Sequence, residues 1–166
     1  HGGLKGFDKV VWTVKSEISK EGLGLELEFI SKDGEEGYPG TLTVTVKNYL
    51  TDKNELIFEY SATTDKTTIV NLTHHGYFNL NGMKSDIKNH LMQIDADKIT
   101  AVNDKLIPTG EFTDVKGSAF DFNKPRKIGE KIADAGGYDH NYILNKKGKS
   151  LSLASVVTDE ESGRVM

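Results

Sequence analysis

The sequence of 166 residues contains no cysteine. Disulfide bonds, thiolate catalysis and cysteine-ligated zinc are therefore excluded for this chain. The absence also fits a cytoplasmic protein, which is the location we expect. Proline is scarce as well, with three residues against 17 glycines, and this balance indicates many tight turns and few rigid linkers.

Long apolar runs and an excess of basic charge are missing too. No apolar stretch approaches the roughly 18 residues of a membrane span, and the formal net charge is -4 with the two signs interspersed. The sequence therefore favours neither a membrane nor a nucleic acid as a partner. With 36% apolar residues and a length typical of one domain, the chain can form a real core.

Much of the chain alternates apolar and polar residues with a period of two, which is typical of β-strands that bury one face. Three such stretches follow one another at residues 23–29, 42–46 and 56–60. Turn signals separate them, Lys-Asp-Gly at residues 32–34 and Asp-Lys-Asn at residues 52–54. We therefore expect an antiparallel meander with one solvated face.

Later segments continue the β pattern. We expect strands at residues 10–14, 92–96, 142–144 and 151–157, and one short helix at residues 128–135 that ends at a Gly-Gly pair. This order predicts an all-β fold, a β-sandwich or a larger supersandwich. Because residues 163–166 resemble the opening of another strand, we expect residues 1–166 to be a single piece, an internal segment of a larger domain.

Residues 69–80 hold more chemically capable side chains than any other stretch. Two histidines, two asparagines and a tyrosine lie between apolar residues that we expect to anchor the stretch, namely Val70, Leu72, Phe78 and Leu80. Polar groups held firmly on an apolar frame are what a binding or catalytic site requires.

The pattern in this stretch favours acid–base chemistry. Adjacent histidines in extended backbone point to opposite faces and cannot easily share one metal ion. The sequence also lacks a His-Glu-x-x-His spacing and a serine nucleophile elbow. Histidine itself, with an unperturbed pKa of about 6.5, suits proton donation near neutrality. We therefore expect neither a metal nor any other cofactor.

A second polar motif, Gly-Tyr-Asp-His-Asn-Tyr at residues 137–142, supplies Asp139. Its carboxylate could stabilise an imidazolium or accept a hydrogen bond from a hydroxyl-rich ligand. It could equally be a turn aspartate that bonds its own backbone. Each histidine, taken alone, is open to the same structural interpretation, and the residues by themselves do not decide between the two.

Three motifs together resemble the aldose 1-epimerase (galactose mutarotase) family. They are His-Gly-Gly at residues 1–3 with Gly-Phe-Asp-Lys at residues 6–9, Asn-Leu-Thr-His-His-Gly-Tyr-Phe-Asn-Leu at residues 71–80, and Gly-Tyr-Asp-His at residues 137–140. They occur in the family's order, and Ser-Gly-Arg at residues 162–164 resembles a fourth. The resemblance implies a galactose-mutarotase-like β-supersandwich, incomplete in this chain. It also implies cofactor-free interconversion of the α and β anomers of free aldoses such as galactose and glucose.

The resemblance also implies roles for individual residues. His75 matches the family's general acid, which protonates the ring oxygen of the sugar. His1, Tyr77 and Asp139 match substrate-binding positions, Tyr77 by its place in the central motif. The family's general base, a glutamate, and a sugar-contacting arginine fall outside residues 1–166, so we expect the isolated segment to be inactive.

Two departures and two alternatives accompany the resemblance. His74 and Gly76 stand where the family often has asparagine and serine or threonine. One alternative is a non-catalytic carbohydrate-binding module. The other is a hexose-6-phosphate 1-epimerase, which would need a cluster of arginines, whereas this sequence has only Arg126 and Arg164. A monosaccharide is the expected partner in every case, and the remaining segments of the domain, as a separate chain, are a further candidate.

Overall fold

A computed structural model describes residues 2–18 and 22–166. The chain divides into two compact units, His1–Gly76 and Tyr77–Met166. In both units the described strands pair antiparallel, and the helices are short. The all-β fold class expected from the sequence is therefore confirmed.

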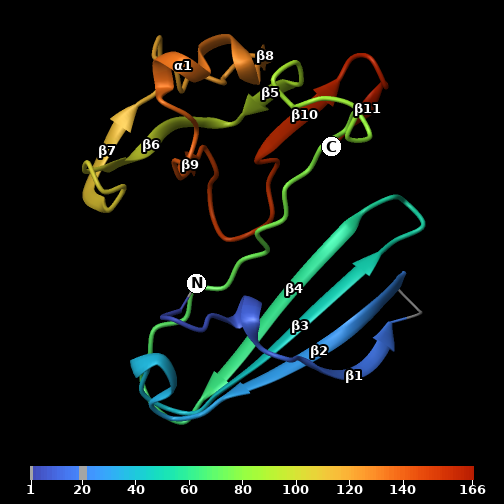
Figure 1. The fold of residues 1–166 in the computed structure, drawn as a ribbon, viewed down its shortest axis with the longest axis vertical. Coiled ribbons are helices and arrows are strands. Elements are labelled where there is room, and N and C mark those ends of the chain that lie inside the picture. The colour runs from blue at the N-terminus through green and yellow to red at the C-terminus, as the bar shows by residue number, and fades with distance from the viewer. Residues whose placement is uncertain (1, 19–21) are drawn as a thin grey trace. The chain divides into compact units, whose positions relative to one another are not determined.

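The first unit is an antiparallel meander (Figure 1). Its four strands follow one another in the order of the chain. The period-two pattern predicted the three-stranded part β2-β3-β4, and β1 is added at its edge. The strands are β1 Thr13–Ile18, β2 Leu23–Ser31, β3 Leu42–Leu50 and β4 Leu56–Thr64, with short 3-10 turns η1 Phe7–Lys9 and η2 Glu35–Gly37. The strand expected at residues 10–14 begins only at Thr13.

The β3–β4 hairpin keeps one register from Leu50↔Leu56 to Leu42↔Thr64. Its turn lies where the sequence predicted one, and the Asn54 N–H donates to the Thr51 carbonyl over 3.0 Å. Asn54 itself is left-handed, with a φ of 61°. Asparagine tolerates this conformation better than most residues, which explains why it occupies the turn.

The buried face of β3 forms the core of the first unit. Leu42, Val44 and Val46 are all at most 9% exposed, and the side chains of Phe7, Trp12 and Leu72 pack against them. The Trp12 indole N–H also donates to the Phe7 carbonyl over 3.0 Å. Residues from the N-terminal segment and from the central motif thus pack on the same strand, β3.

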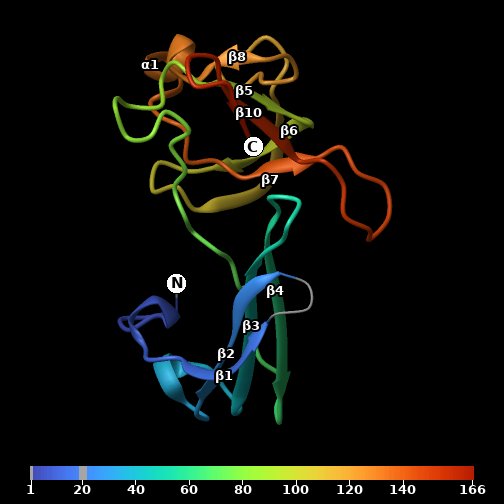
Figure 2. The ribbon, with the colours of Figure 1, turned by 90° about the vertical axis from the view of Figure 1, so that its right-hand side faces the viewer.

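The second unit holds two further sheets, with strand orders β11-β10-β5-β8 and β7-β6-β9 (Figure 2). Their strands are β5 Leu91–Ile94, β6 Ala96–Val102, β7 Pro108–Asp114, β8 Arg126–Lys127, β9 Tyr142–Leu144, β10 Ser155–Asp159 and β11 Arg164–Val165. The strand expected at residues 151–157 begins only at Ser155. Its neighbour β11 confirms the strand that residues 163–166 indicated.

The stretch expected as one strand at residues 92–96 belongs to two strands in different sheets. Asp95 separates them: its N–H donates to the Ala154 carbonyl, and its carbonyl accepts from the Asn145 N–H, each over 2.9 Å. Ala154 continues β10, which pairs with β5, and Asn145 continues β9, which pairs with β6, so the chain changes sheet at Asp95. Unbroken alternation in the sequence does not reveal such a change.

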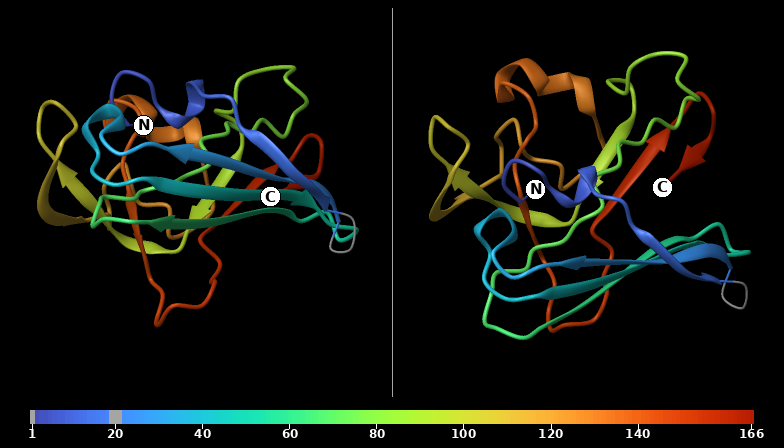
Figure 3. Two further views of the ribbon diagram at one scale, coloured as in Figure 1. Left: turned by 90° about the horizontal axis from the view of Figure 1, so that it is seen from below. Right: turned by 60° about the horizontal axis from the view of Figure 1, so that its bottom comes forward.

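The expected helix at residues 128–135 is present as a 3-10 turn, η3 Ile128–Lys131, followed by α1 Ile132–Ala135 (Figure 3). Gly136 ends it in the left-handed conformation, with a φ of 68°. The Gly136 and Gly137 N–H groups donate to the carbonyls of Ala133 and Ile132. This is the C-terminal stop that the glycine pair indicated.

We predict that Val44→Ala lowers the free energy of unfolding by about 2 kcal/mol, because it removes two buried methyl groups and leaves a cavity. Val14 on β1 is 57% exposed, so the matched control Val14→Ala should cost less than about 0.5 kcal/mol. Urea denaturation of both variants measures the difference. Equal losses would mean that β3 does not form the core.

Candidate active site

The central motif lies outside the sheets, since residues 67–79 belong to neither helix nor strand. Leu72 anchors it to the core of the first unit. Two of the other expected anchors are more open, with Val70 45% and Phe78 44% exposed. Leu72 and Leu80 are half-buried.

The two departures from the family pattern, His74 and Gly76, are in direct contact with each other. The His74 ring stacks on Phe58, with ring centroids 4.0 Å apart and planes inclined by 20°. Its Nδ1 accepts the Gly76 N–H over 3.3 Å. A Cβ at Gly76 would lie 2.4 Å from His74 Cε1. A larger residue at position 76 would therefore displace the His74 ring, so the two departures from the family pattern are in contact with each other.

His75 lines a pocket of the first unit, with a volume of about 1030 Å³. The pocket wall also includes the backbone of the glycine-rich N-terminal segment, Trp12, Tyr60 and Asn71. The structure thus brings the first and central motifs to the same pocket. His1 lies outside the described residues, but Gly2 and Gly3, which follow it, are part of the wall.

The other two candidates belong to the second unit. Tyr77 is its first residue and is 90% exposed. Asp139 is exposed in the loop between α1 and β9. Its neighbours are both held in place, because the Tyr138 hydroxyl donates to the Ala119 carbonyl over 3.2 Å and the His140 ring contacts Phe120 at 4.4 Å between centroids. That Asp139 meets the sugar beside His75 remains a prediction.

Further donors fix the backbone against which the Asp139 loop packs. The Tyr142 hydroxyl donates to the Phe120 carbonyl over 3.0 Å. Burial raises the pKa of Tyr142 to about 12, so this hydroxyl keeps its proton and remains a donor across the physiological range. Arg126 Nη2 donates to the Ala119 carbonyl over 2.6 Å, while its guanidinium lies over the Phe122 ring. The loop that carries Asp139 therefore packs against backbone carbonyls that side-chain donors hold in place.

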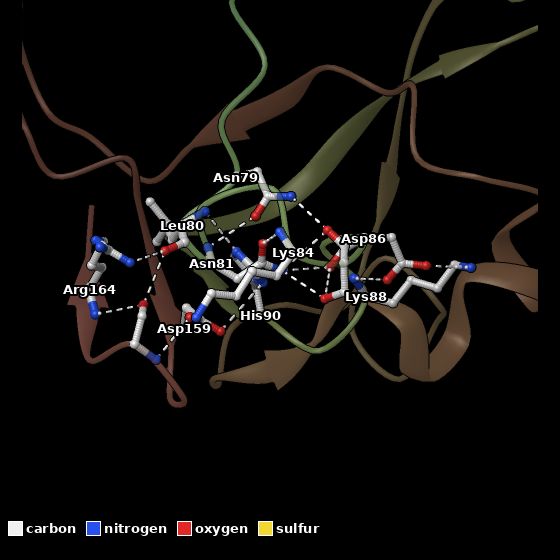
Figure 4. Close-up of polar contacts among 11 residues, drawn as sticks. Asn79, Leu80, Asn81, Lys84, Asp86, Lys88, His90, Asp159 and Arg164 are labelled. Atoms are coloured by element: carbon white, nitrogen blue, oxygen red, sulfur yellow. Dashed lines mark hydrogen bonds and ion pairs between the residues drawn. The ribbon is translucent and has the colours of Figure 1, made fainter.

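A buried network holds the end of the central motif (Figure 4). The Leu80 N–H donates to His90 Nε2 over 3.0 Å. The Leu80 carbonyl accepts from Ser162 Oγ and from Arg164 Nη1, each over 3.0 Å. The Ser-Gly-Arg motif at residues 162–164, which resembled a fourth family motif, thus binds the central motif as a structural anchor.

His90 lies at the centre of this network and is 1% exposed. Because its Nε2 accepts a hydrogen bond, the neutral ring carries its proton on Nδ1, which faces Asp159 Oδ1 at 3.9 Å. The side chain and backbone N–H of Ser162, together with the charge of Arg164, hold the pKa of Asp159 below its ordinary value. Asp159 therefore stays ionised beside His90 at neutral pH.

Asn79 of the motif and Asn81 just after it are structural. Asn79 Nδ2 donates to the Ser85 carbonyl over 2.8 Å. Asn81 is 7% exposed, and its Nδ2 donates to Ser85 Oγ and to the Asp86 carbonyl. The dense Asn, Ser and Asp content of residues 79–86 was a visible turn signal. His90, in contrast, lies in no pattern that would identify it from sequence.

Metal and membrane signals are lacking in the parts of the chain that the structure describes. Within residues 2–18 and 22–166, no group of three His, Asp or Glu side chains could hold a metal ion. None of the helices there reaches the length and apolarity that a transmembrane helix requires.

Solved structures of sugar epimerases share this all-β fold. The aldose epimerase homologue from Caenorhabditis elegans matches with a TM-score of 0.85 at 29% identity, over 98% of this chain and 49% of that chain. The galactose 1-epimerase of Lactobacillus acidophilus NCFM matches with a TM-score of 0.79 at 30% identity, over 92% of this chain and 46% of that chain. The fold is thus that of the mutarotase class.

The chain belongs to the aldose 1-epimerase family, whose sequence profile matches residues 1–166. It is 45% identical over 169 residues to the galactose mutarotase of Homo sapiens, covering 100% of this chain and 48% of that protein. It is 40% identical over 163 residues to the aldose 1-epimerase of Escherichia coli strain K12, covering 95% of this chain and 46% of that protein. The chain therefore spans about half the length of these relatives.

We predict that Asp159→Asn destabilises the protein at neutral pH and that this loss disappears in acid. A carboxyl whose pKa is lowered by folding contributes stability above its unfolded pKa of about 3.9, and the contribution is lost as pH falls through the folded value. The difference in Tm between wild type and variant should therefore be constant near neutrality and shrink below about pH 4.

Thermal unfolding between neutral pH and pH 3 measures this effect. The control is Asp104→Asn, a change of the same chemistry at an exposed residue, and it should show no comparable loss at neutral pH. A difference for Asp159→Asn that does not vary with pH would contradict the electrostatic origin.

Proposed function

We propose that the full-length protein containing this chain is an aldose 1-epimerase that interconverts the α and β anomers of free aldoses. The observation that carries the proposal is the position of His75, which lines the same pocket as the glycine-rich N-terminal segment. Both belong to motifs of the family, and the relatives bear the names galactose mutarotase and aldose 1-epimerase. The pocket combines a proton-donating side chain with polar and aromatic walls, which suits a monosaccharide.

His75 acts in this proposal as the general acid. A base removes the proton of the C1 hydroxyl while the imidazolium of His75 protonates the ring oxygen, and the bond between C1 and that oxygen breaks. The open-chain aldehyde turns about its C1–C2 bond. Ring closure reverses both proton transfers, so His75 recovers its proton and the only net change is the configuration at C1.

His1, Tyr77 and Asp139 bind the sugar hydroxyls in this proposal. An ionised carboxylate such as that of Asp139 accepts strong hydrogen bonds from hydroxyl groups. A phenol such as that of Tyr77 both donates and accepts. Such groups hold the reacting atoms in place, which is a large part of the catalysis expected for a unimolecular ring opening.

The general base of the reaction is proposed to lie outside residues 1–166. The family resemblance assigns it to a glutamate in a motif that these residues do not contain. The proposal therefore divides the two halves of the proton transfer between this chain and the remainder of the domain.

We predict that His75→Asn in the full-length protein lowers kcat for mutarotation by roughly 10²-fold or more, the usual effect of removing a positioned acid. Polarimetry with α-galactose and α-glucose measures the rate. His74→Asn is the matched comparison, and it should cost less because the His74 ring stacks on Phe58 rather than donating a proton to the sugar.

The comparison also separates the functional alternatives. Equal kcat for wild type and His75→Asn would remove His75 from the acid role. A wild-type protein that binds aldoses without accelerating mutarotation would instead be a carbohydrate-binding module.

We further predict that residues 1–166 expressed alone do not accelerate mutarotation, because a lone acid supplies only one of the two proton transfers. Polarimetry on the purified segment beside the full-length protein tests this. Substantial turnover by the segment would show that a base within it acts instead, and the exposed Glu111 and Glu130 would be the first to replace.

A further inference from the structure

The loop between β2 and β3 is closed by its own hydrogen bonds. The Gly34 N–H donates to the Tyr38 carbonyl over 2.9 Å, and the Tyr38 N–H donates to the Glu35 carbonyl over 3.0 Å. Asp33 accepts the Gly40 N–H over 2.6 Å and also pairs with Lys66. The loop is therefore a rigid element, and none of the roles assigned above uses it.

Glu36, at the tip of this loop, binds the N-terminal segment. Its Oε2 accepts the Leu4 N–H over 2.7 Å, and its Oε1 accepts the Lys5 N–H over 3.2 Å. One carboxylate thus holds two consecutive backbone donors that lie more than thirty residues earlier in the chain. Hydrogen bonds to an ionised acceptor are stronger than those between neutral groups.

Gly3 is shaped to receive this carboxylate. Its φ is +78°, and a Cβ built on it would lie 2.1 Å from Glu36 Oε2. A side chain at this position would therefore displace the carboxylate. The glycine in the first motif and the glutamate in the loop are complementary in space.

Glu36 adopts a backbone conformation that is costly for a residue with a side chain. Its φ is 50° and its ψ is 22°, and the nearby Gly34 and Gly37 each have a φ of 84°. Left-handed conformations favour glycine, and a glutamate there costs free energy. A turn that served only to connect β2 and β3 would be most stable with glycine at this position too.

We propose that Glu36 is a positioning residue for sugar binding. It fixes the Gly2–Gly6 segment at the wall of the pocket that His75 lines. The inference rests on the proposed function, because the binding of an aldose in this pocket comes from it. Glu36 also lines this pocket, but both of its carboxylate oxygens are engaged by the Leu4 and Lys5 N–H groups, so its proposed role is to position the segment.

The test uses the full-length protein with Glu36→Gly and a matched control, Asn54→Gly. Asn54 is likewise left-handed, with a φ of 61°, and lies in the β3–β4 turn. Both changes place glycine where a positive φ strains a residue with a side chain, so we expect neither to lower Tm. Only Glu36→Gly should raise KM for galactose, by at least about tenfold, with kcat changed less than about threefold, since each of the two lost charge-assisted contacts corresponds to about a factor of ten.

A second readout does not depend on activity. Amide hydrogen exchange at Leu4 and Lys5 should accelerate by at least about tenfold in Glu36→Gly and remain at the wild-type rate in Asn54→Gly. Glu36→Gln, which keeps one acceptor oxygen, should show smaller changes in both exchange and KM.

The outcomes separate this inference from the proposed function. A wild-type protein without mutarotase activity would overturn the proposed function, and with it the role in sugar binding. An active wild type in which Glu36→Gly retains the KM of Asn54→Gly would overturn the positioning role alone. Unchanged exchange at Leu4 and Lys5 would show that the carboxylate does not hold the segment.

Discussion

Burial of the apolar face of β3 is the constraint on which the first unit depends. Leu42, Val44 and Val46 can leave water only if other apolar side chains cover them, and Trp12 and Leu72 do so. These two residues come from opposite ends of the unit. Hydrophobic burial is non-directional, yet here it determines which loops share a pocket, because covering one strand draws the N-terminal segment and the central motif to the same sheet.

Polar contacts then fix the backbone conformation of the loops that hydrophobic burial brings together. Glu36 binds backbone donors in the N-terminal segment, and the His74 ring accepts the Gly76 N–H. In the second unit His90 and Arg164 satisfy the backbone of Leu80. A buried backbone group without a partner costs more than its hydrogen bond contributes, so the partly buried bond from Leu80 to His90 favours one loop conformation among those that burial alone would allow.

The structure also divides the polar residues of the motifs by role. Asn79 and Ser162 resembled parts of a functional pattern, but their side chains bind neighbouring backbone. His75 lines the pocket and Asp139 is exposed on a supported loop. A conspicuous motif in this family therefore combines residues that hold a loop in shape with residues that the loop presents, and the sequence does not distinguish between them.

The sequence by itself determined the meander, the turns at residues 32–34 and 52–54, the helix stop at Gly136 and the family. These features depend on local periodicity and on residues with special backbone preferences, which neighbours in the chain reveal. Tertiary structure alone decided the change of sheet at Asp95, the burial of His90 and the contact of Glu36 with Leu4. Each of these depends on partners far along the chain, and no local pattern records which distant donor or acceptor a side chain will meet.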